Sequence, residues 1–269
     1  MFSIDGVPLN NPTMGWYLRS ETETKTGRSF DRPSISGAGL DGVSTSLRAT
    51  VGPPIFPIVV ESPEANVGAL QTLLANGSEL KKSTLPGKYA VYEVMSLSPA
   101  AFLPDESLWV VTAMVRLPEV YYRDTAVTTW TQQLPSNTNA TSTPVNVFDG
   151  ITAPIRDAVF RIRGAANGQM KVSEPSGSFF AWPGNLSAGQ FLRFHSDTGR
   201  AFVTNLDTWT GGTEVTGDIA NGPGPYPFEI TPIIVNGDPR VRSGQVTLIV
   251  NGSSSLGAFE VRGRRAYAE

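Results

Sequence analysis

The sequence predicts an all-β protein with one short helix, arranged as two β-domains. Three observations point to this class. Gly and Pro together make up 48 of the 269 residues and are spread along the chain, where about 12% is usual. In the second half, short apolar runs recur about every 8–15 residues with turn residues between them, as in antiparallel sandwiches. Apolar residues make up 40% of the chain, which is enough for a folded core.

The strands of the first half are predicted from apolar runs and alternation. They cover Phe2–Asp5, Met14–Arg19, Val43–Val51, Ile55–Val60, Tyr89–Leu97 and Ser107–Leu117. Pro57 favours either an edge position for its strand or a later start of that strand, because proline cannot donate to a strand ladder. The last run is almost continuously apolar, so we expect it to be buried on both faces.

One helix is predicted after Ile58-Val59-Val60. Ser62, Pro63 and Glu64 supply an N-cap, a first helical residue and an acidic first turn. Apolar residues then follow at helical spacing on one stripe, at Val67, Leu70, Leu73 and Leu74. The sequence predicts that Gly77 ends the helix in a left-handed cap and that the stripe packs on a sheet.

A polar, uncharged segment, residues 132–144, is predicted to link the two domains. Residues 1–131 would form the first domain and residues 145–269 the second. The strands of the second domain are predicted at Ala158–Arg163, Gln169–Ser173, Ser178–Trp182, Phe191–His195, Ala201–Asn205, Phe228–Val235, Gln245–Val250 and Phe259–Arg262. Apolar and basic residues alternate in the first of these, which predicts a half-exposed strand.

The composition excludes most catalytic machinery. The chain has no cysteine and one histidine, His195, so disulfides, thiolate metal sites and multi-histidine sites are excluded. No phosphate-binding loop and no Gly-x-Ser-x-Gly nucleophile motif occurs. We predict no catalytic residue, no metal, no cofactor and no enzyme activity. A glycosidase-type carboxylate pair and a calcium site near Asp197 or Asp238 are the alternatives left open.

Charge and hydropathy narrow the possible partners. The chain has 21 basic and 24 acidic side chains, a net charge of −3, so it lacks the basic excess typical of nucleic-acid binding. No apolar run reaches the roughly 18 residues of a membrane helix. The N-terminal residues do not form a basic region followed by an apolar one. We therefore expect no membrane insertion and no secretion signal.

Aromatic side chains lie at or beside predicted loops, at Trp182, Trp209 and Tyr226. Such rings can stack on sugars or dock on a partner. The alternative is that they cap the ends of the sandwich core. Trp16, Trp109 and Trp130 lie in strand-like runs, where we expect core or inter-subunit packing.

Three segments of the second half carry a resemblance to a known family. Phe148–Ile155 looks like that family's entry to its second domain, Ala158–Gly164 resembles its first strand there, and Trp182–Leu192 is similar to its turn into a following strand. Together with the order of elements before them, they resemble the distal tail protein of long-tailed siphophages, a Dit-like minor tail protein, particularly in phages of actinobacterial hosts.

The resemblance implies a fold and a role. Residues 1–131 would form a tail-tube-like β-sandwich or split barrel that closes into a homo-hexameric ring, and residues 145–269 a galectin-like, jelly-roll-type sandwich. The protein would be a structural component of the virion, assembled in the host cytoplasm. It would join the tail tube protein to the tail-tip hub and anchor receptor-binding or other minor tail proteins.

Two further expectations follow from the resemblance. Genomic DNA would pass through the ring without specific binding, and ring closure would bury the apolar surface of Leu108–Leu117. The alternative function is a carbohydrate- or receptor-binding tail module that uses Trp182, Trp209 and Tyr226.

Overall fold

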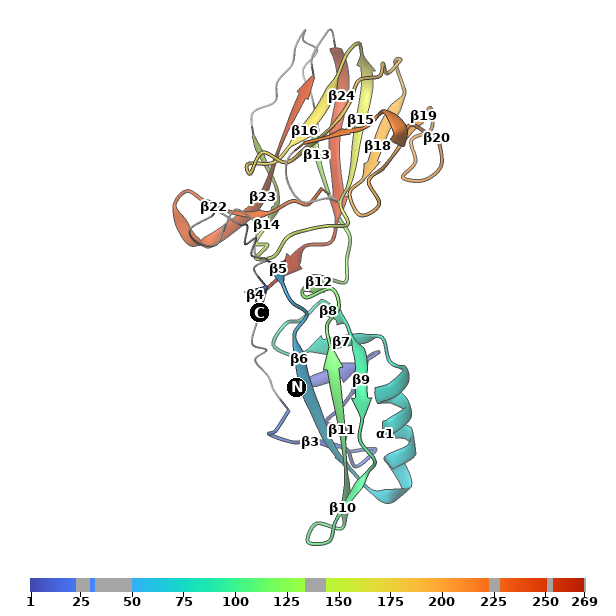
Figure 1. Cartoon of the computed structure of the whole chain (residues 1–269), viewed down its shortest axis with the longest axis vertical. Coiled ribbons are helices and arrows are strands. Elements are labelled where there is room, and N and C mark those ends of the chain that lie inside the picture. Colours follow the sequence, from blue (N-terminus) through green and yellow to red (C-terminus); the bar gives the residue numbers. More distant parts are fainter. Residues whose placement is uncertain (23–29, 32–49, 134–143, 223–227, 251–253, 269) are drawn as a thin grey trace, which may run out of the picture. The chain divides into compact units, whose positions relative to one another are not determined.

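The computed structural model describes residues 1–22, 30–31, 50–133, 144–222, 228–250 and 254–268. Among these residues, all elements are β-strands except the helix α1 (Glu64–Asn76) and the short 3₁₀ helix η1 (Thr216–Asp218) (Figure 1). The prediction of an all-β chain with one short helix is confirmed.

The chain divides into two compact units. Unit 1 contains Met1–Arg123 together with Ala268, and unit 2 contains Asp124–Tyr267. The predicted boundary at residue 131 is therefore too late. Strand β13 (Thr128–Gln133) pairs along its whole length with β24 (Ser254–Gly263) of unit 2. It therefore belongs to the second sandwich, where it forms a sheet edge, and its last two residues, Gln132 and Gln133, are the polar residues that were assigned to the linker. The rest of the predicted linker, residues 134–143, lies outside the described residues.

Unit 1 is built from two facing sheets. One has the order β2-β1-β7-β8-β12, and the other has the order β10-β11-β6-β3 with β9 also paired to β11. The stacked rings of Phe2 on β1 and Phe56 on β6, with centroids 6.1 Å apart, join the two sheets in the core. The strands are β1 (Phe2–Ile4), β2 (Val7–Pro8), β3 (Tyr17–Leu18), β6 (Ile55–Ser62), β7 (Glu79–Lys82), β8 (Lys88–Val91), β9 (Glu93–Leu97), β10 (Ala101–Leu103), β11 (Leu108–Arg116) and β12 (Tyr122–Asp124); β4 (Phe30–Asp31) and β5 (Thr50–Val51) pair separately.

The predicted strand Tyr89–Leu97 is two strands. β8 pairs with β7 in one sheet, while β9 pairs with β11 in the other. The chain changes sheet at Tyr92, whose hydroxyl donates to the carbonyl of Leu74 at the end of α1. Burial raises the pKa of this phenol, so it stays a proton donor. Most of the predicted strand Val43–Val51 lies outside the described residues.

Helix α1 ends at Asn76, next to the predicted Gly77, but the prediction of Ser62 as its N-cap is wrong: Pro63 occupies that position without a side-chain cap bond, and the Ser62 hydroxyl donates to the Pro63 carbonyl. Leu70 and Leu74 are fully buried and the helix packs on β6, β9 and β11, so the prediction that it covers a sheet is confirmed. The prediction of a left-handed cap at Gly77 is wrong, because its φ is −68°. Glycine is required there for space instead: a Cβ would lie 2.3 Å from Ile4 Cγ2 and 2.4 Å from the Tyr92 hydroxyl.

Strand β11 is not buried on both faces, as its apolar run predicted. Val111, Ala113 and Val115 are fully buried, whereas the side chains between them are only partly covered. The buried residues lie opposite Val60, Ile58 and Phe56 of β6. One face of β11 therefore belongs to the core, and the other, which is largely apolar, is only partly covered.

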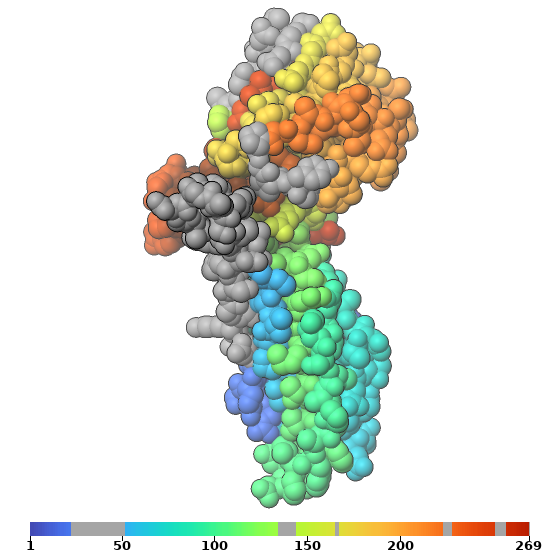
Figure 2. All heavy atoms as spheres, in the orientation of Figure 1, coloured from blue at the N-terminus to red at the C-terminus, as the bar shows by residue number. Residues whose placement is uncertain are grey.

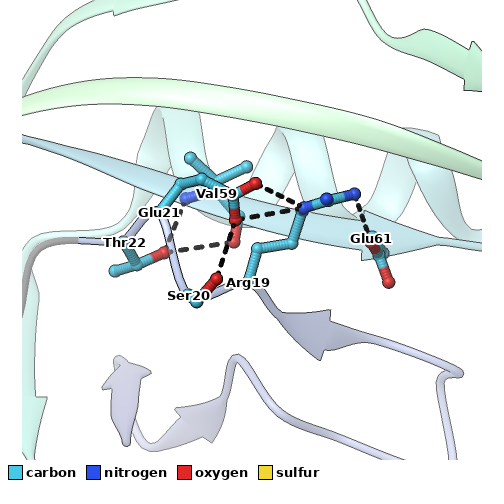
Figure 3. A network of polar contacts seen from close by, with 6 residues as sticks. All are labelled: Arg19, Ser20, Glu21, Thr22, Val59 and Glu61. Carbon is cyan, nitrogen blue, oxygen red and sulfur yellow. Dashed lines mark hydrogen bonds and ion pairs between the residues drawn. The ribbon is translucent and has the colours of Figure 1, made fainter.

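A polar network ties the segment after β3 to β6 (Figure 3). The Thr22 hydroxyl accepts a hydrogen bond of 2.9 Å from the N–H of Val59, and the N–H of Arg19 donates to the Val59 carbonyl. The Arg19 guanidinium also pairs with Glu61 at 2.6 Å. Desolvation by burial raises the pKa of the Glu61 carboxyl, and nearby Glu106 raises it further.

Unit 2 is a sandwich of two antiparallel sheets. One sheet has the order β13-β24-β15-β18-β19-β20, and the other has the order β14-β23-β16-β17-β21 with β22 also paired to β23. The strands are β14 (Val145–Asp149), β15 (Val159–Ala166), β16 (Met170–Ser173), β17 (Phe179–Trp182), β18 (Phe191–His195), β19 (Arg200–Thr204), β20 (Thr213–Glu214), β21 (Ala220–Asn221), β22 (Pro232–Val235), β23 (Asp238–Val250) and β25 (Ala266–Tyr267). All eight strands predicted here are present, although that from Phe228 begins later.

Five phenylalanines form the centre of the unit 2 core. Phe160 lies at the middle of this cluster, with ring contacts to the other four, and the rings of Phe180 and Phe194 stack at 3.8 Å. The cluster is completed by Phe228 and Phe259. Because Phe160 and Phe180 come from opposite sheets, their contact holds the two layers together.

Candidate functional site

The outer face of the sheet β24-β15-β18-β19 carries a lattice of arginines and aromatic rings. Strand register places Glu260, Arg161, Arg193 and Phe202 side by side on four successive strands. The loop between β19 and β20, residues 205–212, covers this row. Two arginines directly opposite each other repel, so the surrounding groups must compensate their charge.

Arg161 is the best compensated of these groups. Its guanidinium lies 2.5 Å from Glu260 and 2.7 Å from Asp207, and its side chain is 7% exposed. The Trp209 ring lies over the same guanidinium, with its centroid 4.3 Å away, and the Phe191 ring lies 4.9 Å away. The sequence predicted a half-exposed strand here. Arg161 is buried instead, because the 205–212 loop folds over it.

Arg193 is buried beside it, and its Nη1 has no hydrogen-bond partner among the described residues. Its Nε donates to His195 Nε2 at 3.0 Å, its Nη2 donates to the Gly211 carbonyl at 2.6 Å, and the Phe202 ring lies 5.0 Å away. Burial lowers the pKa of this guanidinium, and the charge of Arg161 lowers it further.

His195 has a structural place in this lattice. Burial lowers the pKa of its imidazole, and Arg193 and Arg200 lower it further against the opposing effect of Asp197. The neutral ring accepts the Arg193 hydrogen bond and stands edge-on to Phe202.

Trp209 is the one predicted contact residue that the structure places beside a depression. The ring is partly exposed and lies 5.2 Å from the guanidinium of Arg262, in addition to Arg161. A depression of about 320 Å³ opens beside it, lined by Val127, Asp157, Val159, Trp209, Thr210, Arg262, Gly263 and Arg264. Two guanidiniums, one carboxylate and an indole can hold a polar group that carries a negative charge.

The other two predicted contact residues, Trp182 and Tyr226, have different outcomes from Trp209. Trp182 is only 5% exposed, so the expectation that its ring faces a partner is wrong and the alternative, a role in the core, is what the structure has. The turn after it folds back onto the ring, and a Cβ on Gly184 would lie 2.1 Å from the indole. Tyr226 lies outside the described residues.

The predicted absences remain predictions. Among the described residues, no group of three His, Asp or Glu side chains could hold a metal ion, near Asp197 and Asp238 included. In the same part of the chain, no helix has the length and hydropathy to cross a membrane.

Comparison with known proteins rests on solved structures. No protein-family model and no curated protein sequence matches the chain. The crystal structure of SPP1 Dit, a hub adsorption apparatus protein of phages that infect Gram-positive bacteria, matches with a TM-score of 0.57 and 12% identity over 98% of both chains. This chain has the Dit fold. The match extends over both units, so the Dit fold accounts for the order of elements along nearly the whole chain.

Two phage P2 baseplate structures also match. The one in its activated conformation with Ca has a TM-score of 0.35 and 9% identity, over 93% of this chain and 90% of that one. The one with Sr has a TM-score of 0.32 and 8% identity, over 89% and 88%.

The sequence did not reveal the buried arginine pair. The alternation in Ala158–Arg163 indicated that Arg161 lies on the outer face, and this is correct. The register that brings Arg193 opposite it, and the loop that covers both, depend on pairing between strands 30 residues apart. A loop that combines Asp207 and Trp209 with two glycines was the only local signal.

Proposed function

We propose that this protein is the distal tail protein of a long-tailed phage, a ring subunit at the tail tip. The observation that carries the proposal is the Dit fold along 98% of the chain. The half-open apolar face of β11 supports it, because a ring interface would cover that surface. Six copies would form a closed ring through unit 1.

In this role the protein connects parts and carries out no chemistry. The ring joins the tail tube protein to the tail-tip hub, and unit 2 anchors receptor-binding or other minor tail proteins. DNA passes through the lumen without specific binding, since each copy carries a net charge of −3 and repels phosphates. The protein is assembled in the host cytoplasm and resides in the virion.

The test is the assembly state of the purified chain together with its place in the particle. Gold-labelled antibodies against the protein should mark the junction between tube and tip in phage particles. Labelling confined to the capsid, or to the tube along its length, would overturn the proposal.

A second function is favoured by the depression beside Trp209. We infer that an acidic sugar or an acidic partner side chain could bind there, with the negative group on Arg262 and the apolar part on the indole. A glycan array probed with the wild type and Trp209→Ala tests this. Equal signals from both proteins remove the carbohydrate function and leave the ring function untouched.

A further inference from the structure

Unit 1 carries two surface features of complementary chemistry. The first is the end of the β10–β11 hairpin, residues 102–109, here called the hairpin tip. Phe102 is 50% exposed, and its ring lies 5.3 Å from the partly exposed ring of Trp109 on the facing strand. Asp105 and Glu106 form the turn between them, both exposed. The hairpin tip therefore presents aromatic rings and two carboxylates, and no basic side chain.

An exposed aromatic pair at the end of a hairpin needs an explanation. Exposed apolar groups gathered at one place are typical of interaction surfaces, and aromatic residues are enriched at the centres of interfaces. Figure 1 shows the β10–β11 hairpin extending beyond the end of α1, and Figure 2 shows the same region at the lower end of unit 1. The hairpin tip contributes little to the core of its own unit.

The second feature is a groove along β1 and β7, here called the lysine groove. It has a volume of about 240 Å³ and is lined by Met1, Phe2, Ser3, Pro8, Lys81, Lys82, Ser83, Leu85, Pro86, Gly87 and Lys88. Three of the five lysines of the chain lie here, together with the N-terminal ammonium group of Met1. The carboxylate of Glu79 pairs with Lys81 at 3.2 Å.

The floor of the lysine groove is apolar. Lys82 is 7% exposed and its ammonium group lies 5.6 Å from the centroid of the Phe2 ring. Pro8, Leu85 and Pro86 complete the apolar lining. An engineered cavity of about 150 Å³ holds a benzene molecule, so the groove has room for one aromatic ring. Apolar walls flanked by ammonium groups match a ring flanked by carboxylates.

We propose that the hairpin tip of one copy docks in the lysine groove of the next copy. Phe102 fills the apolar part, and Asp105 and Glu106 face Lys81, Lys88 and the N-terminal ammonium. The inference rests on the proposed ring function and names its contact. Two different surfaces meet, so the contact is heterologous, the kind that generates a ring when the rotation closes.

The occupant is a second copy because the two features belong to different sheets of unit 1. The hairpin tip lies at the end of the sheet containing β11, and the groove lies on the sheet containing β1 and β7. In Figure 1 the β10–β11 hairpin and strand β7 lie at separate places within the unit. Each copy is acidic overall, at −3, so the charges of two copies attract only where a basic surface meets an acidic one.

Disulfide trapping tests the contact, because the natural chain has no cysteine. One variant carries Ser83→Cys in the groove and the other carries Ser107→Cys in the hairpin tip. Mixed and oxidised, they should give a heterodimer as the main product, and either variant alone should give little dimer. One chain with both cysteines should give a ladder of covalent multimers.

Charge-reversal variants test whether the contact depends on attraction between the tip carboxylates and the groove ammonium groups. Asp105→Lys with Glu106→Lys on the tip variant, or Lys81→Glu with Lys88→Glu on the groove variant, should each lower the heterodimer yield about tenfold or more. Mixing the two reversed variants should restore it. The matched control for the groove variant is Arg240→Glu with Arg242→Glu in unit 2, which changes the net charge by the same amount and in the same direction and should leave the yield unchanged.

The outcomes separate this inference from the ring itself. A ring seen by electron microscopy without tip–groove disulfides overturns the inference and leaves the proposed function standing. Equal yields of tip–tip or groove–groove dimers also overturn it, because they indicate a contact between identical surfaces. Absence of both a ring and any disulfide overturns the inference and the ring function together.

Discussion

The two units differ in how far they bury their aromatic and charged side chains. Unit 2 packs five phenylalanines in one core cluster and buries Arg161 and Arg193 under a loop of its own chain. Unit 1 leaves Tyr17 and Phe102 about half exposed on its strands. Among the described residues, the two aromatic side chains that are about half exposed both belong to unit 1, although unit 2 also exposes the aliphatic side chains of Leu206, Ile234 and Val241. This difference is what a ring subunit requires if closure occurs through unit 1.

The largest expected effect contrasts two phenylalanines. Phe160→Ala removes the centre of the unit 2 cluster and should cost about 3–5 kcal/mol of unfolding free energy. Phe102→Ala should cost less than about 1 kcal/mol, because its ring is already half exposed, yet it should abolish self-association. Urea denaturation and light scattering of both variants measure the two effects. A large stability loss in Phe102→Ala would show that the hairpin tip belongs to a core.

The second contrast concerns the two carboxylates that face Arg161. Glu260→Gln should destabilise unit 2 by about 2–4 kcal/mol, because it weakens the compensation of two buried guanidiniums. Asp207→Asn should cost less than about 1 kcal/mol, since its side chain is 66% exposed and exposed pairs are weak. Thermal unfolding at constant salt compares the two. Equal losses would contradict the burial argument.

Replacing either of two glycines in unit 1 by alanine should change the free energy of unfolding, in opposite directions. Gly77→Ala forces a Cβ against Ile4 and Tyr92, and such overpacking costs about 1–3 kcal/mol. Gly68→Ala lies within α1 with nothing within 4 Å of the new Cβ, and it should stabilise the protein by about 0.5–1 kcal/mol. Denaturant titration of unit 1 measures both. Stabilisation by Gly77→Ala would contradict the close approach.

The smallest effect is a pH dependence from the single histidine. Folding lowers the pKa of His195 from its ordinary value of about 6.5, which it keeps in the unfolded chain. Just below that pH the unfolded chain therefore binds more protons than the folded one. The contribution is complete above that pH and is lost as the pH falls. His195→Asn keeps an acceptor for Arg193 and should flatten the stability curve between about pH 7 and 5. An unchanged slope would show that His195 titrates equally in both states.

The sequence predicted strands well and their partners poorly. The apolar alternation in Phe191–His195 and Phe2–Asp5 is local, and the structure has β18 and β1 there. Burial of β11 depends on what covers its second face, which a run of apolar residues does not encode. The change of sheet at Tyr92 depends in the same way on α1, which receives its hydrogen bond.

The candidate site was predictable only in part. Trp209 was singled out because it lies in a polar, glycine-containing loop. The sequence could not distinguish Trp182 from Trp209, because both lie next to turn residues. The difference is the packing of the Trp182 ring against Gly184, which only the structure shows. The arginine lattice required the register of β15 with β18, which no local pattern specifies.

The central claim is ring closure through unit 1, and the mass of the purified assembly tests it most directly. Light scattering combined with negative-stain imaging of the same sample should show six copies of the 28.8 kDa chain, about 173 kDa, around a central hole. Phe102→Ala should shift this species to the single-chain mass. A wild-type protein that stays at 28.8 kDa at every concentration, with no disulfide between Ser83→Cys and Ser107→Cys copies, would contradict the account.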